Sequence, residues 1–332
     1  MAKISVLGSG AWGTALAMLL SDNGHEVLLW SPFAEHTEEL RRTRKSSALG
    51  GLELPAGMQF TSDMKKAGER QDAIVLATAS VYTRGVAREL RPYVKTGQLL
   101  VCVAKGIEEK SLLFQTDEVQ EEIPDAVVAC LSGPSHAEEV ARRLPTTCVA
   151  GAADSAVAEQ VQALFMNRVF RVYTSTDVKG IELGGAVKNV IALAAGIADG
   201  LGYGDNTKAA LITRGIAETA RLGVKIGAHW ETFAGLTGIG DLIVTCASMH
   251  SRNRRAGILI GQGKPVEEAM REVGQVVEGV YSAKAALALA EREQVEMPIV
   301  DVVNRVLFSE LPAAEAVRML MERDPIAEWN NL

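Results

Sequence analysis

The chain begins with a short apolar run that leads straight into a glycine-rich turn. This segment reads Ile4-Ser5-Val6-Leu7-Gly8-Ser9-Gly10-Ala11-Trp12-Gly13 and is followed by small, helix-favouring residues. Gly8 permits a tight turn, Gly10 lets the backbone approach a pyrophosphate, and Gly13 lets the next helix pack on the strand. The start of that helix offers N–H groups and the positive end of its dipole to phosphates. A dinucleotide site is therefore favoured over a glycine-rich turn that binds nothing.

The composition limits the class of protein and its partners. The 332 residues suffice for about two domains. The net charge of −7 argues against nucleic acid or an anionic membrane as a general partner, but not against an anionic substrate. We expect no membrane insertion, because the best uncharged apolar stretch, Val190–Ala198, is too short. Without a CxxC pair or a signal peptide, the cysteines are predicted to be reduced core thiols of a cytoplasmic protein. They are Cys102, Cys130, Cys148 and Cys246.

Strand-like and helix-like segments alternate through the first half of the chain. Continuous apolar runs between helices are typical of a parallel sheet covered on both faces. The predicted strands are Ile4–Leu7, Val27–Trp30, Ala73–Ala77, Leu99–Val103, Val127–Leu131 and Thr147–Ala150, with Arg168–Tyr173 as a further candidate. From about Ser175 the sequence favours helices and loops only, beginning with a long helix over Thr176–Leu201.

This pattern predicts an α/β fold with two domains. A doubly wound Rossmann-type sheet, the dinucleotide-binding domain, is expected over residues 1–178. An all-α C-terminal domain, carrying substrate and catalytic groups, is expected over residues 179–332. The last residues, 329–332, are expected to be loosely held.

Two loops that follow predicted strands carry candidate ligand-binding residues. Ligands of open α/β sheets bind beyond the carboxyl ends of the strands, and Lys105 stands there after the fourth predicted strand. After the fifth, Gly133 permits a close backbone approach, and Ser135 either caps the next helix or donates to a ligand. His136 is a weaker candidate for the acid of a hydride transfer.

The long helix contains a lysine among small residues. Residues three and four apart share a helix face, and the face of Lys188 carries Gly184, Gly185, Ala192 and Ala195. This pattern predicts an open slot beside a functional ammonium group, and Asn189 follows directly. The alternative is close helix packing, with Lys188 extending to water.

Polar residues in the C-terminal half complete the candidate set. Asp241 follows Gly238-Ile239-Gly240 and could hold a lysine ammonium or a substrate hydroxyl. Ser251-Arg252-Asn253 begins a predicted helix, where Arg252 could bind phosphate with its guanidinium. A solvated basic helix start is the alternative. The segment Val276–Gly279 resembles a short edge segment.

The second predicted strand lacks the acid that normally binds the adenosine ribose. Its end reads Trp30-Ser31-Pro32-Phe33, and Glu35 lies beyond the tip. Without that acid nothing repels a 2′-phosphate, and without an arginine nothing attracts one. We therefore predict weak discrimination between NAD and NADP.

Six motifs, in this order, resemble the bacterial NAD(P)-dependent glycerol-3-phosphate dehydrogenase family. They are Gly8–Ala17, Ala104–Ile107, Leu131–Ser135, Ala186–Asn189, Gly238–Leu242 and Ser251–Asn253, and they extend over nearly the whole chain. The resemblance implies NAD or NADP as cofactor, no metal, and reversible reduction of dihydroxyacetone phosphate to sn-glycerol 3-phosphate for glycerophospholipid synthesis. It also implies a cytoplasmic homodimer.

The same resemblance assigns roles to residues. Lys188 is implied as the catalytic acid and base. The implied substrate-binding residues are Lys105, Gly133, Ser135, Lys188, Asp241, Ser251, Arg252 and Asn253. Beside the three glycines Gly8, Gly10 and Gly13, the implied cofactor-binding residues are Ala11, Trp12, Pro32, Phe33, Lys105, Ala137, Arg252, Val276 and Glu278. Ala11 stands where the family often has Ser, and Pro32 and Phe33 stand where it often has basic residues. These departures bear on the cofactor preference.

The implied reaction places demands on the lysine. Negative charge develops on the ketone oxygen during reduction, and an ammonium can stabilise it and supply the proton. The usual lysine pKa of about 10.4 is too high for proton exchange at neutral pH. We expect burial and Lys105 to lower the pKa of Lys188, and Asp241 to oppose this and hold the geometry.

Three other functions remain open from the residues alone. One is a related two-domain reductase of the 3-hydroxyacid or 6-phosphogluconate type, and another is a lactate-type enzyme that uses His136. The third is a nicotinamide-binding sensor without turnover.

Overall fold

A computed structural model describes residues 1–325 and 327–328 of the chain. The chain divides into two compact units, one of residues 1–104 and 115–178 and the other of residues 105–114 and 179–332. The segment predicted to be loosely held, residues 329–332, lies outside the described residues.

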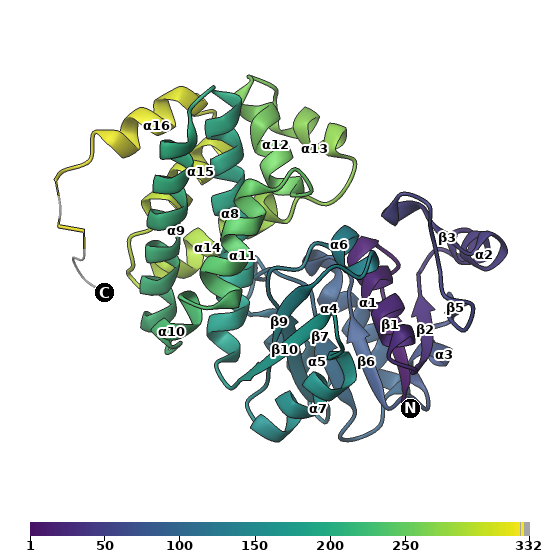
Figure 1. The fold of residues 1–332 in the computed structure, drawn as a ribbon. Coiled ribbons are helices and arrows are strands. Elements are labelled where there is room, and N and C mark those ends of the chain that lie inside the picture. The colour runs from purple at the N-terminus through teal and green to yellow at the C-terminus, as the bar shows by residue number, and fades with distance from the viewer. Residues whose placement is uncertain (326, 329–332) are drawn as a thin grey trace. The chain divides into compact units, whose positions relative to one another are not determined.

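The first unit is built on an eight-stranded sheet with the order β10-β9-β8-β7-β6-β1-β2-β5 (Figure 1). Its strands are β1 (Lys3–Leu7), β2 (Glu26–Trp30), β5 (Gln59–Thr61), β6 (Ala73–Leu76), β7 (Leu99–Cys102), β8 (Val127–Ser132), β9 (Thr146–Gly151) and β10 (Phe170–Ser175). The neighbouring strands are parallel at every pair except β8 and β9, which are antiparallel.

The expectation of a wholly parallel sheet is therefore wrong at β8 and β9. The connection between these strands contains only the five-residue helix α6 (Ala137–Ala141). Such a helix advances about 7 Å, whereas a strand of six residues is about 20 Å long. The connection therefore does not carry the chain back along the sheet for a parallel crossover.

Helices cover both faces of this sheet (Figure 1). One face is covered by α1 (Ala11–Asp22), α6 and α7 (Ser155–Phe165), and the other by α3 (Met64–Gly68), α4 (Thr83–Leu90) and α5 (Gln115–Glu122). Successive strand residues point to opposite faces, so Ile4 and Val6 enter one core and Leu7 the other. The predicted doubly wound sheet is confirmed.

Smaller elements complete the first unit. Helix α2 (Ala34–Thr43) follows β2 and contributes Leu40 to the core. A two-stranded hairpin of β3 (Lys45–Ser46) and β4 (Leu52–Glu53) follows α2. The hairpin and β5 were not predicted. All four cysteines of the chain lie buried as thiols, as predicted.

The second unit is helical and is arranged around α8 (Val178–Gly200), in which residues 180–198 are all buried. Its other helices are α9 (Asp205–Lys225), α10 (Trp230–Phe233), α11 (Asp241–Ala247), α12 (Arg252–Gly261), α13 (Val266–Val273), α14 (Glu278–Arg292), α15 (Pro298–Phe308) and α16 (Ala313–Met321). The predicted all-α character is confirmed. The expected edge segment at Val276–Gly279 is wrong, because α14 begins at Glu278.

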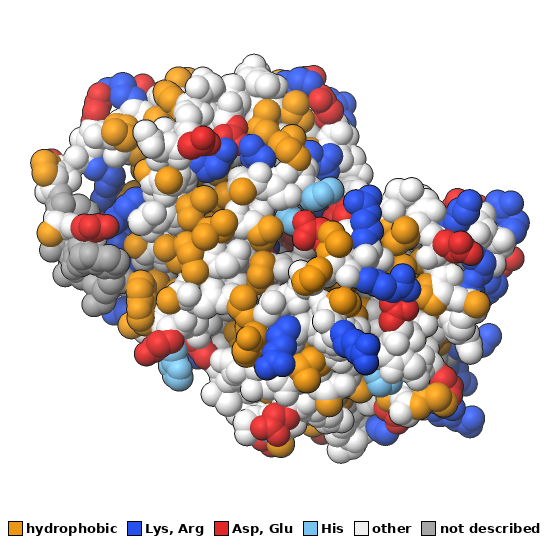
Figure 2. All heavy atoms as spheres, in the orientation of Figure 1, with side chains coloured by type: hydrophobic (Ala, Val, Ile, Leu, Met, Phe, Trp, Pro, Cys, Tyr) orange, Lys and Arg blue, Asp and Glu red, His pale blue; other side chains and the backbone are white. Residues whose placement is uncertain are grey.

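The segment that follows β7 also belongs to this unit. Ile107 and Phe114 are joined by an antiparallel bridge and are buried in the helical core. The unit also exposes hydrophobic side chains, among them Val224 on α9 and Ile243 on α11. Figure 2 shows hydrophobic side chains gathered over the part of this unit where Figure 1 labels α9 and α11.

Helix α8 would be long and apolar enough to cross a membrane by length and composition alone, as would one bent helix pair, Trp230–Ala247 with Arg252–Gly261. The whole apolar window of α8 is buried within the helical unit. Burial of this kind is typical of the core helix of a globular domain.

Glycines bring α12 unusually close to α8. A Cβ atom added at Gly257 of α12 would lie 2.3 Å from the carbonyl oxygen of Leu193 in α8. Reciprocally, a Cβ atom on Gly196 of α8 would lie 2.2 Å from the carbonyl oxygen of Arg254. Only glycine allows backbones to pack at this distance, so the start of α12 is fixed relative to α8.

Candidate active site

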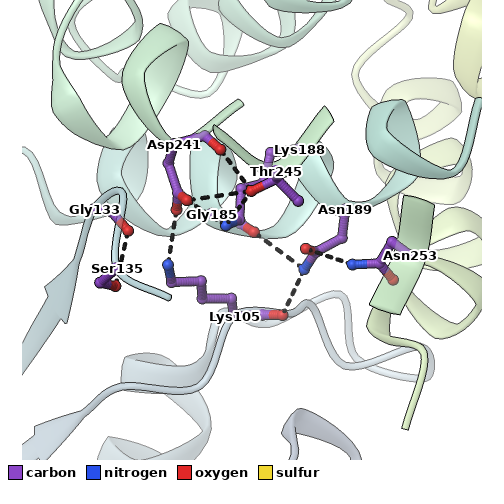
Figure 3. Close-up of polar contacts among 9 residues, drawn as sticks. All are labelled: Lys105, Gly133, Ser135, Gly185, Lys188, Asn189, Asp241, Thr245 and Asn253. Carbon is purple, nitrogen blue, oxygen red and sulfur yellow. Dashed lines mark hydrogen bonds and ion pairs between the residues drawn. The ribbon is translucent and has the colours of Figure 1, made fainter. Parts of the chain in front are cut away.

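The helical unit brings two lysines onto a single carboxylate (Figure 3). Nζ of Lys105 lies 2.7 Å from Oδ2 of Asp241. Nζ of Lys188 donates to Oδ1 of the same residue and lies 3.0 Å from Oγ1 of Thr245. Asp241 is 1% exposed and Lys188 is 8% exposed. Asp241 therefore holds a lysine ammonium, one of the two roles expected for it, and it holds two of them.

A kinked turn places Asp241 at this position. The turn Leu236–Gly240 is interrupted at Gly238, with φ −94° and ψ −106°, and α11 begins directly at Asp241. A Cβ atom on Gly184 of α8 would lie 2.5 Å from the carbonyl oxygen of Thr237. Gly184 therefore allows the turn to pack on α8, and the open slot predicted at this glycine is replaced by backbone contact.

Thr245 is a member of the site that sequence reasoning missed. It lies one helical turn after Asp241, accepts from Nζ of Lys188, and donates its hydroxyl to the Asp241 carbonyl at 2.6 Å. The spacing of four residues from Asp241 puts both on one face of α11. This spacing was the only sequence signal for Thr245 as a site residue, but a single threonine in a helix says little about function.

Burial and charge set the protonation of this centre. Burial lowers the pKa of Lys188 to about 7, the carboxylate of Asp241 opposes this shift, and the charge of Lys105 adds to it. These are the directions that the sequence predicted. For Asp241, burial raises the pKa, but the charges of Lys105 and Lys188 outweigh burial and hold the pKa below its usual value. An amine with a pKa near neutrality can both donate and accept a proton.

Two carboxamides join the helices around the lysines (Figure 3). Nδ2 of Asn253 donates to Oδ1 of Asn189 at 2.9 Å, and Oδ1 of Asn253 accepts from the backbone N–H of Gly279 at 2.8 Å. Nδ2 of Asn189 donates to the carbonyl oxygens of Gly185 at 3.3 Å and of Lys105 at 3.5 Å. The two side chains therefore tie α8, α12, α14 and the Lys105 segment together.

The start of α12 presents a cation. The Ser251 hydroxyl caps the helix by accepting from the N–H of Arg254 at 3.2 Å. The Arg254 guanidinium pairs with Asp199, Nε to Oδ2, at 2.8 Å. Arg252 is half-buried and has no hydrogen bond or ion pair of its side chain within residues 1–325 and 327–328. Its charge is therefore available for an anion.

In the first unit, the glycine-rich turn has the geometry of a pyrophosphate cradle. Gly8 has φ +124°, and a Cβ atom there would lie 2.6 Å from the carbonyl oxygen of Ala77. A Cβ atom on Gly13 would lie 1.9 Å from the Gly8 carbonyl oxygen, whereas Gly10 has open space beside it. Gly10 precedes α1 and supplies no side-chain cap for its first N–H groups. These features fit a nicotinamide dinucleotide.

The end of β2 is apolar at its surface. Phe33 is 69% exposed, and its backbone N–H donates to the hydroxyl of the buried Ser31 at 3.4 Å. The only acid in the first turn of α2 is Glu35, and its basic residues, Arg41 and Arg42, lie in the last turn. Neither this tip nor the first turn of α2 therefore contains a lysine or an arginine, although His36 stands in that turn.

Two further predicted positions lie in the loop after β8. Gly133 has φ +150°, and a Cβ atom there would lie 2.9 Å from Cα of Cys148, so this glycine lies close to the backbone of strand β9. The Ser135 hydroxyl donates to the Gly133 carbonyl at 3.0 Å. Helix α6 begins at Ala137 after His136, so the capping role considered for Ser135 is wrong.

The remaining predicted cofactor residues lie at the starts of helices or just before them. Ala11 and Trp12 begin α1, and the buried indole Nε1 of Trp12 has no hydrogen-bond partner among the described residues. Val276 is half-buried, and Glu278 is the first residue of α14. Within the described part of the chain, no group of three or more His, Cys, Asp or Glu side chains is placed to bind a metal.

Comparisons with known proteins agree along the whole chain. The family profile described as NAD-dependent glycerol-3-phosphate dehydrogenase N-terminus matches residues 3–158, and the corresponding C-terminus profile matches residues 177–318. The chain is 59% identical to a glycerol-3-phosphate dehydrogenase (NAD(P)+) of Agathobacter rectalis, over 100% of this chain and 99% of the relative. It is 56% identical to that of Fusobacterium nucleatum, over 98% of both chains.

A solved structure shares the fold. The crystal structure of glycerol-3-phosphate dehydrogenase from Coxiella burnetii matches with a TM-score of 0.94 at 36% identity, covering 97% of this chain and 99% of that chain.

Proposed function

Because the chain belongs to the NAD-dependent glycerol-3-phosphate dehydrogenase family, we propose that it catalyses the reversible reduction of dihydroxyacetone phosphate to sn-glycerol 3-phosphate with NADH or NADPH. The observation that carries this proposal is the buried Lys188 ammonium on the Asp241 carboxylate, with Lys105 on its other oxygen. In this account residues 1–178 hold the dinucleotide, and residues 179–332 carry the catalytic lysine and the phosphate-binding groups.

The cofactor, when bound, supplies the hydride. The residues that would hold its pyrophosphate are in the glycine-rich turn: Gly8, Gly10, Ala11, Trp12 and Gly13. Pro32 and Phe33 would contact the adenosine end, and the remaining cofactor residues would be Lys105, Ala137, Arg252, Val276 and Glu278.

Lys188 acts as the acid of the reduction. In its protonated form it donates a hydrogen bond to the C2 oxygen of the ketone, stabilises the negative charge that develops there, and gives its proton to the new hydroxyl. The neutral amine is then protonated again from solvent. In the reverse reaction the neutral amine accepts the hydroxyl proton. Asp241 holds the amine in place, and Lys105 adds positive charge near the same oxygen.

The substrate phosphate is held away from the reacting carbon. Arg252 forms charge-assisted hydrogen bonds to the phosphate from the start of α12, and Ser251 and Asn253 lie beside it. Gly133 and Ser135 are the remaining substrate-binding residues in this proposal. Binding energy from such a remote group can orient the ketone for hydride transfer.

We also propose that the protein is a cytoplasmic homodimer whose product supplies glycerophospholipid synthesis. The family membership supports each of these assignments.

Steady-state oxidation of NADH and of NADPH with dihydroxyacetone phosphate tests the proposal. The readout is the loss of absorbance of the reduced nicotinamide. Dihydroxyacetone, which lacks the phosphate, serves as the matched control and is expected to react at least about 100-fold less efficiently, since charged phosphate contacts are lost. A 3-hydroxyacid, 6-phosphogluconate and lactate, each tested with the oxidised cofactor, address the rival functions. Preferred turnover of one of them contradicts the proposal, and tight cofactor binding without turnover of any substrate identifies a sensor.

A further inference from the structure

A second arginine of α12, Arg255, resembles Arg252 in its burial and in lacking a side-chain partner within the described part of the chain. Arg255 follows Arg252 by three residues, so the two side chains leave the same side of the helix with their Cβ atoms about 5–6 Å apart. Both residues are half-buried. Neither side chain makes a hydrogen bond or an ion pair with residues 1–325 or 327–328.

Buried polar groups usually have a hydrogen-bond partner, and the Nε atom of Arg255 is an exception. It is buried and has no hydrogen-bond partner among the described residues. A guanidinium remains charged at any physiological pH, so a buried donor without an acceptor is costly. A buried orphan donor of this kind calls for an explanation, and an anionic ligand supplies the missing acceptor.

Two carboxylates near α12 are already committed to other cations. Asp199 pairs with Arg254 at 2.8 Å and with Lys208 at 2.9 Å. Asp241 binds Lys105 and Lys188. Neither of these carboxylates pairs with Arg252 or Arg255, so the two arginines add positive charge at the start of α12, although the chain as a whole has a net charge of −7. Local positive charge on an acidic protein indicates a site for an anion.

We infer that Arg255, together with Arg252, binds a phosphate group. This inference rests on the proposed function and extends it, because it adds a second guanidinium to the phosphate-binding groups. Two planar guanidiniums on one helix face can donate to different oxygens of one phosphate. The phosphate belongs either to the three-carbon substrate or to the pyrophosphate of the dinucleotide, and these two sources are separated by the experiment.

The test compares the parent protein with R255Q, which removes the charge and keeps a polar side chain. R305Q is the matched control, because Arg305 is a half-buried arginine on α15 of the same unit without a side-chain partner among the described residues. Calorimetry gives the Kd of inorganic phosphate and of NADH for each protein, and steady-state kinetics give KM and kcat for dihydroxyacetone phosphate.

For a substrate phosphate, R255Q raises the KM for dihydroxyacetone phosphate and the Kd of inorganic phosphate by about tenfold or more, with a smaller change in kcat. For the dinucleotide, R255Q raises the Kd of NADH by a similar factor. In both cases R255K restores part of the affinity and R305Q matches the parent. The inference is overturned when all of these constants for R255Q stay within about twofold of the parent, whether or not its Tm falls.

Two further measurements separate the remaining outcomes. If R255Q does not fold, a crystal structure of the parent protein grown with NADH and inorganic phosphate decides: a phosphate oxygen within hydrogen-bond distance of the Arg255 guanidinium supports the inference, and its absence there overturns it. If the parent protein does not reduce dihydroxyacetone phosphate, the proposed function fails. The calorimetric comparison still tests Arg255 in that case, because it needs no turnover.

Discussion

Lys105 and Lys188 are bound to the two oxygens of one carboxylate, that of Asp241. Two ammonium groups therefore share a single negative charge inside a buried site. The carboxylate raises the pKa of Lys188 while burial and Lys105 lower it. The protonation of Lys188 thus depends on this one acid.

Substituting Asp241→Asn removes that charge and keeps the shape of the side chain. We expect kcat for ketone reduction to fall by about 100-fold or more, as is typical when a preorganised electrostatic group is lost. The pKa of Lys188 also falls, because the charge that raises it is gone. The pH profile of kcat measures both effects. Asp205→Asn, at an exposed acid of α9, is the control and is expected to keep the pH profile of the parent. A D241N profile that matches the parent would show that Asp241 does not set the protonation of Lys188.

The two directions of the reaction are expected to have opposite pH dependence. In the proposed mechanism reduction needs the protonated Lys188, whose pKa is about 7, so kcat for reduction is expected to fall as the pH rises through this value. Oxidation needs the neutral amine, so its kcat rises over the same range. Pre-steady-state rates of hydride transfer in both directions provide the measurement. Rates that do not depend on pH between about 6 and 9 exclude Lys188 as the acid and base.

The close contact of α12 with α8 should be intolerant of a single methyl group. Gly257→Ala places a Cβ atom 2.3 Å from the Leu193 carbonyl oxygen, so α12 must shift. We expect a loss of about 1–3 kcal/mol in the free energy of unfolding, together with a raised KM for dihydroxyacetone phosphate, because Arg252 begins this helix. The control, Gly85→Ala in α4, meets no atom within 4 Å and is expected to stabilise by about 0.5–1 kcal/mol. Chemical unfolding and steady-state kinetics on both variants make the comparison. A G257A protein with the stability and KM of the parent would contradict the proposed importance of this close helix contact.

Cofactor choice is expected to be weak in the parent protein. No lysine or arginine lies at the tip of β2 or in the first turn of α2, although His36 stands in that turn, and the acid there, Glu35, lies past the tip. We expect kcat/KM for NADH and NADPH to differ by less than about tenfold. Phe33→Arg adds a cation beside the adenosine ribose and should shift the ratio about tenfold toward NADPH. Phe33→Leu controls for loss of the aromatic ring, and an unchanged ratio in F33R places the ribose elsewhere.

The sequence was sufficient for the elements that depend on local pattern. Apolar runs between helical segments predicted the main strands, and the glycine spacing predicted the turn at Gly8–Gly13. The antiparallel β8 and β9 pair was not predictable in this way, since strand direction depends on the length and course of the connection. Residues 105–114 carried no signal that they pack with the helical unit, because their burial arises from long-range contacts of Ile107 and Phe114.

The candidate site was also only partly predictable, because only some of its residues stand in an unusual local sequence context. Lys188 and Asp241 stand beside glycines, and that unusual context marked them in the sequence. Thr245 has an ordinary helical context, and only the folded α11 shows that it contacts Lys188. Gly184 was interpreted as open space, whereas in the fold it contacts the backbone at Thr237. A small residue in a sequence does not distinguish a slot from a close contact.

The role of Lys188 as the proton donor is central to the proposed mechanism. The most direct test is the single-turnover rate of NADH oxidation by Lys188→Met with dihydroxyacetone phosphate, together with the Kd of NADH. Methionine keeps the unbranched stem and removes the ammonium. We predict a rate reduced by about 1000-fold or more, with a Kd within about twofold of the parent. A K188M rate within about tenfold of the parent would contradict the mechanism.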